Sequence, residues 1–180
     1  MFGGRRERLE ANQARWQRFT DISGPMVAGL ITGIQNHDST QINDYFVQLK
    51  DFPTVPGEDL IMFSYGLAED LYRTSEIRHL TDRQRVDLIA DYTSWWVPKE
   101  YAVNMIGLRE IMEHRRSAGN RFDPIAMMMC AFVLCAYLLP NGGANEHVRR
   151  FCTTLPPGFF INNVYTPVTP YPRKGRVDPA

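Results

Sequence analysis

The sequence predicts an all-α fold in a single domain, a helical bundle around one buried apolar central helix at about residues 123–139. Three observations support this prediction. The stretch from Pro124 to Pro140 contains no charged residue. Other segments repeat apolar residues at steps of three and four, as amphipathic helices do. Strict alternation of apolar and polar residues, which is typical of strands, is scarce.

The central helix has sequence signals at both ends. Asp123 is a favourable N-cap residue, and Pro124 stands at the first helical position, where its missing N–H is not needed. Pro140 and the glycines after it cannot continue a helix. The residues between the prolines would extend about 22 Å, short of the roughly 30 Å hydrocarbon layer of a membrane. We therefore expect the helix to be enclosed by protein, with no membrane association.

A basic stretch at the start of the chain predicts a polar helix over residues 5–19. It has few large apolar side chains, so we expect an arm that docks through a few aromatic residues. Ser23-Gly24-Pro25 then predicts a break and the opening of a second helix. Gly29 and Gly33 lie four residues apart on that helix, a spacing that lets another backbone approach closely.

Four amphipathic helices are expected next, and a short helix near 144–153 is expected after the central one. Asp38-Ser39-Thr40-Gln41 and Thr81-Asp82-Arg83-Gln84 both resemble capping boxes, which start helices. Pro98 is expected to restart the chain as a new helix. The four apolar stripes are Ile42, Tyr45, Phe46 and Leu49; Leu60, Phe63, Leu67 and Leu71; Val86, Ile89, Tyr92, Trp95 and Trp96; and Tyr101, Met105, Leu108 and Met112.

The composition changes from Leu155 onward. Six of the twelve prolines fall in the last twenty-six residues, which excludes a regular helix there, yet large apolar side chains are also frequent. A disordered tail is normally poor in such residues, so we expect them to be covered by their own domain or by a neighbouring chain. The predicted organisation is a basic N-terminal arm (1–19), a helical domain (20–154) and a Pro-rich C-terminal arm (155–180).

Charge is segregated along the chain, although the whole chain is neutral. Residues 1–19 hold five arginines and two glutamates, and residues 171–180 hold three basic residues and one aspartate. The remainder has twelve basic and seventeen acidic residues, a net charge of −5. Basic ends on an acidic body suit an acidic neighbouring subunit or a polyanion such as nucleic acid. Short charged ends that are merely solvated would give the same pattern.

The cysteines and the first residues indicate where the chain is expected to reside. Three is an odd number, and Cys130 and Cys135 lie within the central helix, so we expect buried reduced thiols, Cys152 included, in a reducing environment. No apolar run follows the first charged residues, so no secretory signal is expected. The expected location is cytoplasmic, or inside an assembled particle, and not secreted.

Two pairs of side chains have a spacing that metal ligands can have. Glu76 and His79 have the Glu-x-x-His spacing of di-iron helices, but a second such step is missing, which favours a solvated helix end. Asp87 and Asp91 are one turn apart, but they point away from the apolar stripe of their helix and indicate a solvent face. We therefore expect no metal and no cofactor.

A thiolate pair and a tryptophan pair complete the candidates. His147 and Cys152 have two arginines between them, and nearby cations lower a thiol pKa, but five residues on a helix would not bring them face to face. Trp95 and Trp96 cannot both face one core; Trp96 lies with the stripe, and Trp95 is either core or part of a subunit or ligand surface. Neither pair amounts to a catalytic signature.

The resulting hypothesis is a non-enzymatic structural protein that self-associates as a homo-oligomer. A coat- or nucleocapsid-type subunit of a virion or capsid is one form, with basic ends that bind nucleic acid or acidic neighbouring subunits. The alternative is a small helical enzyme or ligand-binding module with a pocket beside the central helix, lined by Met105, Met112, Met127, Met128 and Met129, although no small-molecule substrate is evident. The expected binding residues are Arg5, Arg6, Arg8, Arg15, Arg18, Arg173, Lys174 and Arg176, and the expected assembly surface comprises Trp95, Phe159, Phe160, Val164, Tyr165 and Tyr171.

Overall fold

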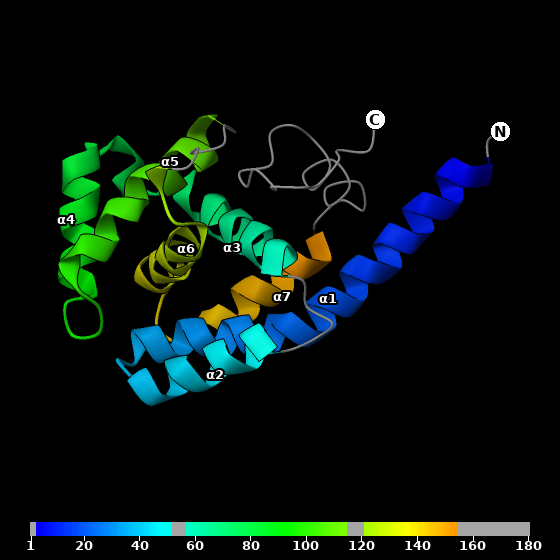
Figure 1. The fold of residues 1–180 in the computed structure, drawn as a ribbon, viewed down its shortest axis with the longest axis horizontal. Helices are drawn as coiled ribbons and strands as arrows, with labels where there is room; N and C mark the ends of the chain where they lie inside the picture. Colours follow the sequence, from blue (N-terminus) through cyan, green and yellow to red (C-terminus); the bar gives the residue numbers. More distant parts are fainter. Residues whose placement is uncertain (1–2, 52–56, 115–120, 155–180) are drawn as a thin grey trace.

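The computed structural model describes residues 3–51, 57–114 and 121–154 (Figure 1). These ranges form α-helices and two short 3-10 helices without a β-strand, so the predicted all-α single-domain fold is confirmed. In chain order the elements are α1 (Gly3–Gln35), α2 (Ser39–Asp51), α3 (Gly57–Tyr72), η1 (Glu76–His79), α4 (Asp82–Tyr92), η2 (Lys99–Val103), α5 (Asn104–His114), α6 (Pro124–Leu138) and α7 (Ala144–Thr154).

Helix α6 is the predicted central helix, and it packs against α1, α3, α4 and α5. Its predicted start is confirmed, since the Asp123 carboxylate accepts hydrogen bonds from the backbone N–H groups of Ile125 and Ala126. Ten of its fifteen side chains are buried. Enclosure is incomplete toward the ends, where Ile125 and Tyr137 are exposed, and at Met129, which is half-buried. No helix in the described ranges is both long and apolar enough to cross a bilayer.

The predicted break at Ser23-Gly24-Pro25 is wrong, because α1 is one continuous helix with Pro25 inside it. Proline lacks the N–H that would bond the carbonyl of Asp21, and both residues are exposed, so water can satisfy that carbonyl. The buried hydroxyl of Ser23 donates to the carbonyl of Phe19. Gly24 lies against Val148 of α7, and Val27 and Ala28 after the proline are buried, so packing on both sides of Pro25 keeps the helix intact.

Helices α1 and α2 form a close hairpin, with Gly29 and Gly33 at their contact. A Cβ at Gly29 would lie within 3 Å of the Tyr45 ring, and one at Gly33 would lie 3.1 Å from a side-chain carbon of Ile42. Between the helices, His37 takes a left-handed conformation with φ 55°, which normally favours glycine. Its imidazole stacks on Trp95, with ring centroids 4.6 Å apart.

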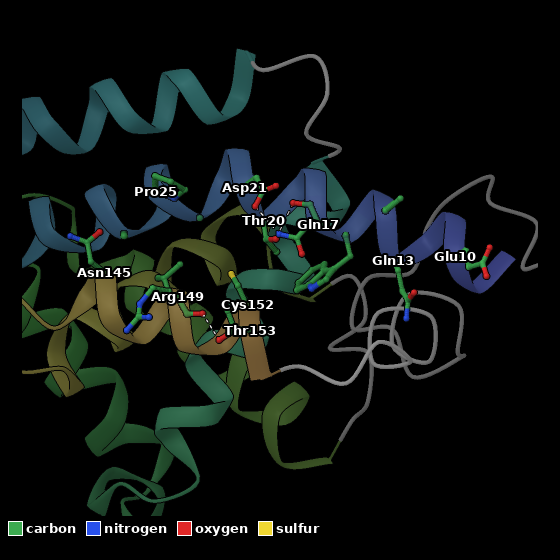
Figure 2. Close-up of a pocket in the computed structure, with 15 residues that line it drawn as sticks. Glu10, Gln13, Gln17, Thr20, Asp21, Pro25, Asn145, Arg149, Cys152 and Thr153 are labelled. Atoms are coloured by element: carbon green, nitrogen blue, oxygen red, sulfur yellow. Dashed lines mark hydrogen bonds between the residues drawn. The ribbon is translucent and has the colours of Figure 1, made fainter. Parts of the chain in front are cut away.

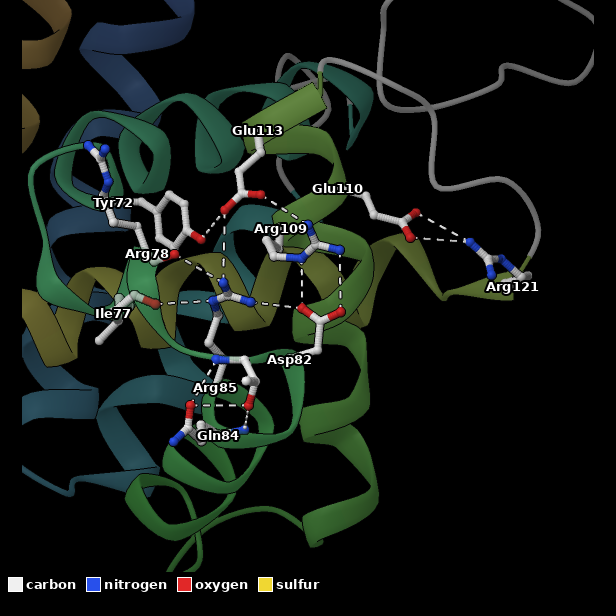
Figure 3. Close-up of polar contacts among 11 residues, drawn as sticks. Tyr72, Ile77, Arg78, Asp82, Gln84, Arg85, Arg109, Glu110, Glu113 and Arg121 are labelled. Atoms are coloured by element: carbon white, nitrogen blue, oxygen red, sulfur yellow. Dashed lines mark hydrogen bonds and ion pairs between the residues drawn. The ribbon is translucent and has the colours of Figure 1, made fainter.

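A polar network joins α3, α4 and α5 (Figure 3). The buried guanidinium of Arg85 donates to the carbonyls of Ile77 and Arg78 and pairs with Asp82 at 2.8 Å. Arg109 of α5 pairs with the same aspartate at 2.7 Å and with Glu113 at 3.0 Å. The predicted capping box at Thr81 is also present and starts α4 within this network.

The prediction that Trp95 and Trp96 extend α4 is wrong. The helix ends at Tyr92, and Thr93 leaves helical geometry while its hydroxyl donates to the carbonyl of Ile89. Both tryptophans lie in the turn that follows.

The helix predicted from Pro98 is likewise shorter than expected. Residues Lys99–Val103 form the 3-10 helix η2, so Tyr101 leaves the expected stripe and is 52% exposed. Met105, Leu108 and Met112 of α5 are buried as predicted.

The buried core runs from Phe19 to Val148 in the described ranges, and Phe19 is the first buried residue of α1. The predicted boundary between arm and domain at residue 19 therefore falls inside one helix, at the point where burial begins. The C-terminal arm, residues 155–180, lies outside the described residues.

Candidate functional site

The first sixteen residues of α1 project from the helical body as an arm, which we define as residues 3–18 (Figure 1). At about 1.5 Å per residue the arm is roughly 24 Å long. Every described side chain from Arg5 to Arg18 is exposed, apart from the half-buried Trp16. Trp16 stacks on Phe19 at 5.6 Å and contacts Phe63 edge-on at 5.8 Å, and so anchors the base of the arm to the body.

The arm carries most of the predicted basic residues. Arg5, Arg6, Arg8 and Arg18 are exposed; Arg15 lies on the same helix, but its side chain is outside the described part of the structure. Arg6 pairs with Glu10 one turn away at 3.0 Å, in full contact with solvent. Such an exposed pair contributes little to stability, about 0.3–0.5 kcal/mol. The arm is therefore a basic helix with little packing of its own among the described residues.

An open groove of about 990 Å³ lies between α1 and α7 at the base of the arm (Figure 2). Trp16, Gly24, Ala28 and Val148 are among its apolar lining. Its rim carries two carboxylates and one guanidinium, those of Glu10, Asp21 and Arg149. The groove therefore combines apolar lining with a slightly acidic rim.

His147 and Cys152 do not form a thiolate pair, as expected from their spacing. Burial raises the pKa of the Cys152 thiol to about 11, the opposite of an activated cysteine. The buried His147 ring lies instead against α3, where its Nε2 is 3.2 Å from the carbonyl of Leu67 and its Nδ1 is 3.9 Å from Asp70. Cys152 is only half-buried, unlike Cys130 and Cys135, which are buried as predicted.

The predicted solvent positions of the carboxylate pairs agree with the structure. Asp87 and Asp91 are exposed and pair loosely with Arg83 and Lys99, at 3.9 and 3.8 Å. Glu76 and His79, on η1, are exposed as well. No group of three or more His, Cys, Asp or Glu side chains suited to a metal ion occurs within residues 3–51, 57–114 and 121–154.

The predicted assembly residues divide between the body and the C-terminal arm. Trp95 is half-buried, donates its indole N–H to the carbonyl of Tyr92, and stacks on Trp96 with centroids 5.8 Å apart. Its role in assembly stays a prediction. The remaining predicted residues lie outside the described part of the chain; they are Phe159, Phe160, Val164, Tyr165, Tyr171, Arg173, Lys174 and Arg176.

A second cavity, of about 310 Å³, lies beside the first half of α6. The alternative hypothesis expected a methionine-lined pocket here, but only Met129 lines this cavity. The other four methionines of that set are buried in the core: Met105, Met112, Met127 and Met128.

No protein-family model, characterised protein or solved structure matches the chain.

Sequence reasoning did not indicate the groove, and it expected a pocket beside the central helix with a different lining, of which only Met129 is present. The groove brings Gly24 and Pro25 against Asn145, and the second cavity brings Ile42 against Val133. Residues so far apart in the chain leave no local signal of their meeting. One local signal bears on the second cavity: Pro98 disfavours helical geometry at the residue before it. The sequence therefore indicates that the helix ends before Pro98, within the segment that lines this cavity.

Proposed function

We propose that this chain is a non-enzymatic structural protein that self-associates, and that the arm of α1 reaches a neighbouring copy. The observation that carries the proposal is the exposure of every described side chain over more than three turns of helix, apart from Trp16. A helical segment with little packing among the described residues is marginal in water, because helices gain most of their stability from tertiary contacts. A partner surface would supply those contacts.

The charge of the arm favours an acidic partner. Residues 1–19 carry a net charge of +3, and the rest of the chain before residue 171 carries −5. A second copy of the body therefore attracts the arm. A polyanion would attract it as well, as in a coat- or nucleocapsid-type particle, but Glu7 and Glu10 interrupt the basic run. We therefore take the body of a neighbouring copy as the first partner and nucleic acid as the outcome to be tested against it.

The groove between α1 and α7 offers a place for the C-terminal arm of a neighbouring copy. That segment combines apolar side chains with prolines, and polyproline-like chains lose little entropy on docking. Its basic residues Arg173, Lys174 and Arg176 complement the rim carboxylates of Glu10 and Asp21. Docking onto its own body is the competing outcome, since Cys152 and Thr153 at the end of α7 already line the groove.

Charge reversal on the arm tests the proposal. Sedimentation velocity would compare the wild type with the double variant Arg5→Glu/Arg8→Glu and with Arg83→Glu, a control on the exposed face of α4. The arm variant is expected to remain monomeric, while the control associates like the wild type. Association should also weaken at high salt, where charges are screened within a few ångströms.

Unchanged association of the arm variant would contradict the proposal. A high ratio of absorbance at 260 to 280 nm in the purified wild type, lost in the arm variant while self-association persists, would make nucleic acid the partner of the arm.

A further inference from the structure

The cavity beside α6 is formed by four elements and the turn after α4. Its apolar walls include Phe46 of α2, Ile89 of α4, Trp96 of the turn, and Met129 and Val133 of α6. We propose that this cavity binds a small neutral molecule with an apolar, ring-containing body. The proposal is independent of self-association, because none of the arm residues lines the cavity.

The cavity is enclosed at its base and open at a mouth. Ile42, Ile89 and Val133 are nearly inaccessible to solvent, with 0%, 2% and 3% of their surface exposed. Tyr101 and Ile125, which also line the cavity, are 52% and 45% exposed. An apolar body that covered these two side chains would gain free energy from the apolar area it removes from water.

Charge within the cavity excludes an anionic ligand. No lysine, arginine or histidine lines it, and its one charged side chain is the carboxylate of Asp123. That carboxylate is engaged as the N-cap of α6. An anion would lose its hydration here and gain no cation in return.

Side chains that can donate hydrogen bonds are nevertheless among the lining residues of the cavity. The half-buried Trp96, whose indole carries an N–H, and the exposed Asn43, whose side chain is an amide, both line the cavity. The hydroxyl of Thr93 already donates to the carbonyl of Ile89. A ligand with one acceptor, such as a carbonyl or ring nitrogen, therefore fits better than a pure hydrocarbon. This combination of apolar walls and few polar groups is typical of small-molecule sites.

A neutral fluorescent probe tests the proposal directly. N-phenyl-1-naphthylamine, which brightens in apolar surroundings, would be titrated into the full-length protein. We expect saturable binding of one probe per chain. The affinity for the sulfonated analogue 1-anilinonaphthalene-8-sulfonate should be weaker than that for the neutral probe by about tenfold or more. Replacement of Ala126, which lines the cavity, by Phe should reduce probe affinity about tenfold or more.

Two further variants keep the test decisive. Ala14→Phe adds the same side chain to the groove between α1 and α7 and should leave probe binding unchanged. If Ala126→Phe loses its helical circular dichroism, Met129→Trp fills the cavity from a half-buried position instead. Non-saturable binding, or equal affinity in a folded cavity-filling variant, would overturn the proposal. Probe binding to the monomeric arm variant Arg5→Glu/Arg8→Glu but not to the wild type would overturn the proposal too. That result would mean that a second copy of the chain occupies the cavity.

Discussion

Cys130, Cys135 and Cys152 illustrate how individual side chains behave in this fold. All three are free thiols, and burial raises the pKa of each, to about 12 for Cys130 and about 11 for Cys152. At neutral pH they are protonated, so none is an activated nucleophile. The same burial acts on His147 in the opposite direction and lowers its pKa, because the charged form of histidine is its protonated form.

His147 should make the protein less stable in mild acid. Its folded-state pKa lies below the ordinary 6.5, so the stability it contributes is present above about pH 6.5 and is lost as pH falls through the folded pKa. Asp70 and Arg150 act on the ring with opposite signs and are weaker than burial. We expect the melting temperature to fall less between about pH 7.5 and pH 5 in His147→Gln, which can still donate to Leu67, than in the wild type. His79→Gln, at an exposed histidine, is the control; if both variants follow the wild type, His147 does not govern this response.

At the scale of elements, two arginines on α4 differ sharply in surroundings. The side chain of Arg85 is 7% exposed and joins η1, α4 and α5, whereas that of Arg83 is 92% exposed. Replacement of Arg85 by Ala would leave the carbonyl of the buried Ile77 without its donor and would remove one of the two arginines that pair with Asp82. It should cost about 3 kcal/mol of unfolding free energy. Arg83→Ala should change it by less than about 0.5 kcal/mol. Urea denaturation measures both, and equal values would show that the network contributes nothing.

A second pair of substitutions compares a core residue of α6 with a surface residue of α4. Phe132 is fully buried, so Phe132→Ala should cost about 3–5 kcal/mol through lost apolar contacts and the cavity left behind. Asp87→Ala, on the solvent face of α4, should cost less than about 0.5 kcal/mol. Urea denaturation measures both changes. A loss of less than about 0.5 kcal/mol of unfolding free energy in Phe132→Ala would mean that α6 is not the centre of the core.

The elements that could be predicted from sequence are those whose signals are local. Asp123 and Thr81 cap their helices through side chains only two or three residues from the groups they bind. Pro25 was misjudged because contacts with a helix more than a hundred residues away hold α1 together across it. The turn at Trp95 was misjudged because apolar periodicity continued past the end of the helix. Periodicity shows which side chains are buried but does not fix where a helix ends.

At the scale of the whole molecule, charge and composition mark the first residues as a basic polar segment but do not indicate the groove or the cavity. The exposed arginines of α1 are visible in the sequence as a basic run. The groove and the cavity depend on which helices become neighbours, and that is decided by packing of the entire core around α6.

Self-association is the central claim, and the molar mass in solution tests it most directly. Light scattering after size-exclusion chromatography would be measured over a range of concentrations for the full chain and for residues 1–154, a truncation that leaves the described core from Phe19 to Val148 intact. We expect the mass of the full chain to exceed its monomer value of 20.7 kDa and to rise with concentration, while the truncated chain stays folded and associates less. Equal association of both chains would show that the C-terminal segment is not part of the interface. A mass of 20.7 kDa for the full chain at every concentration would contradict self-association itself.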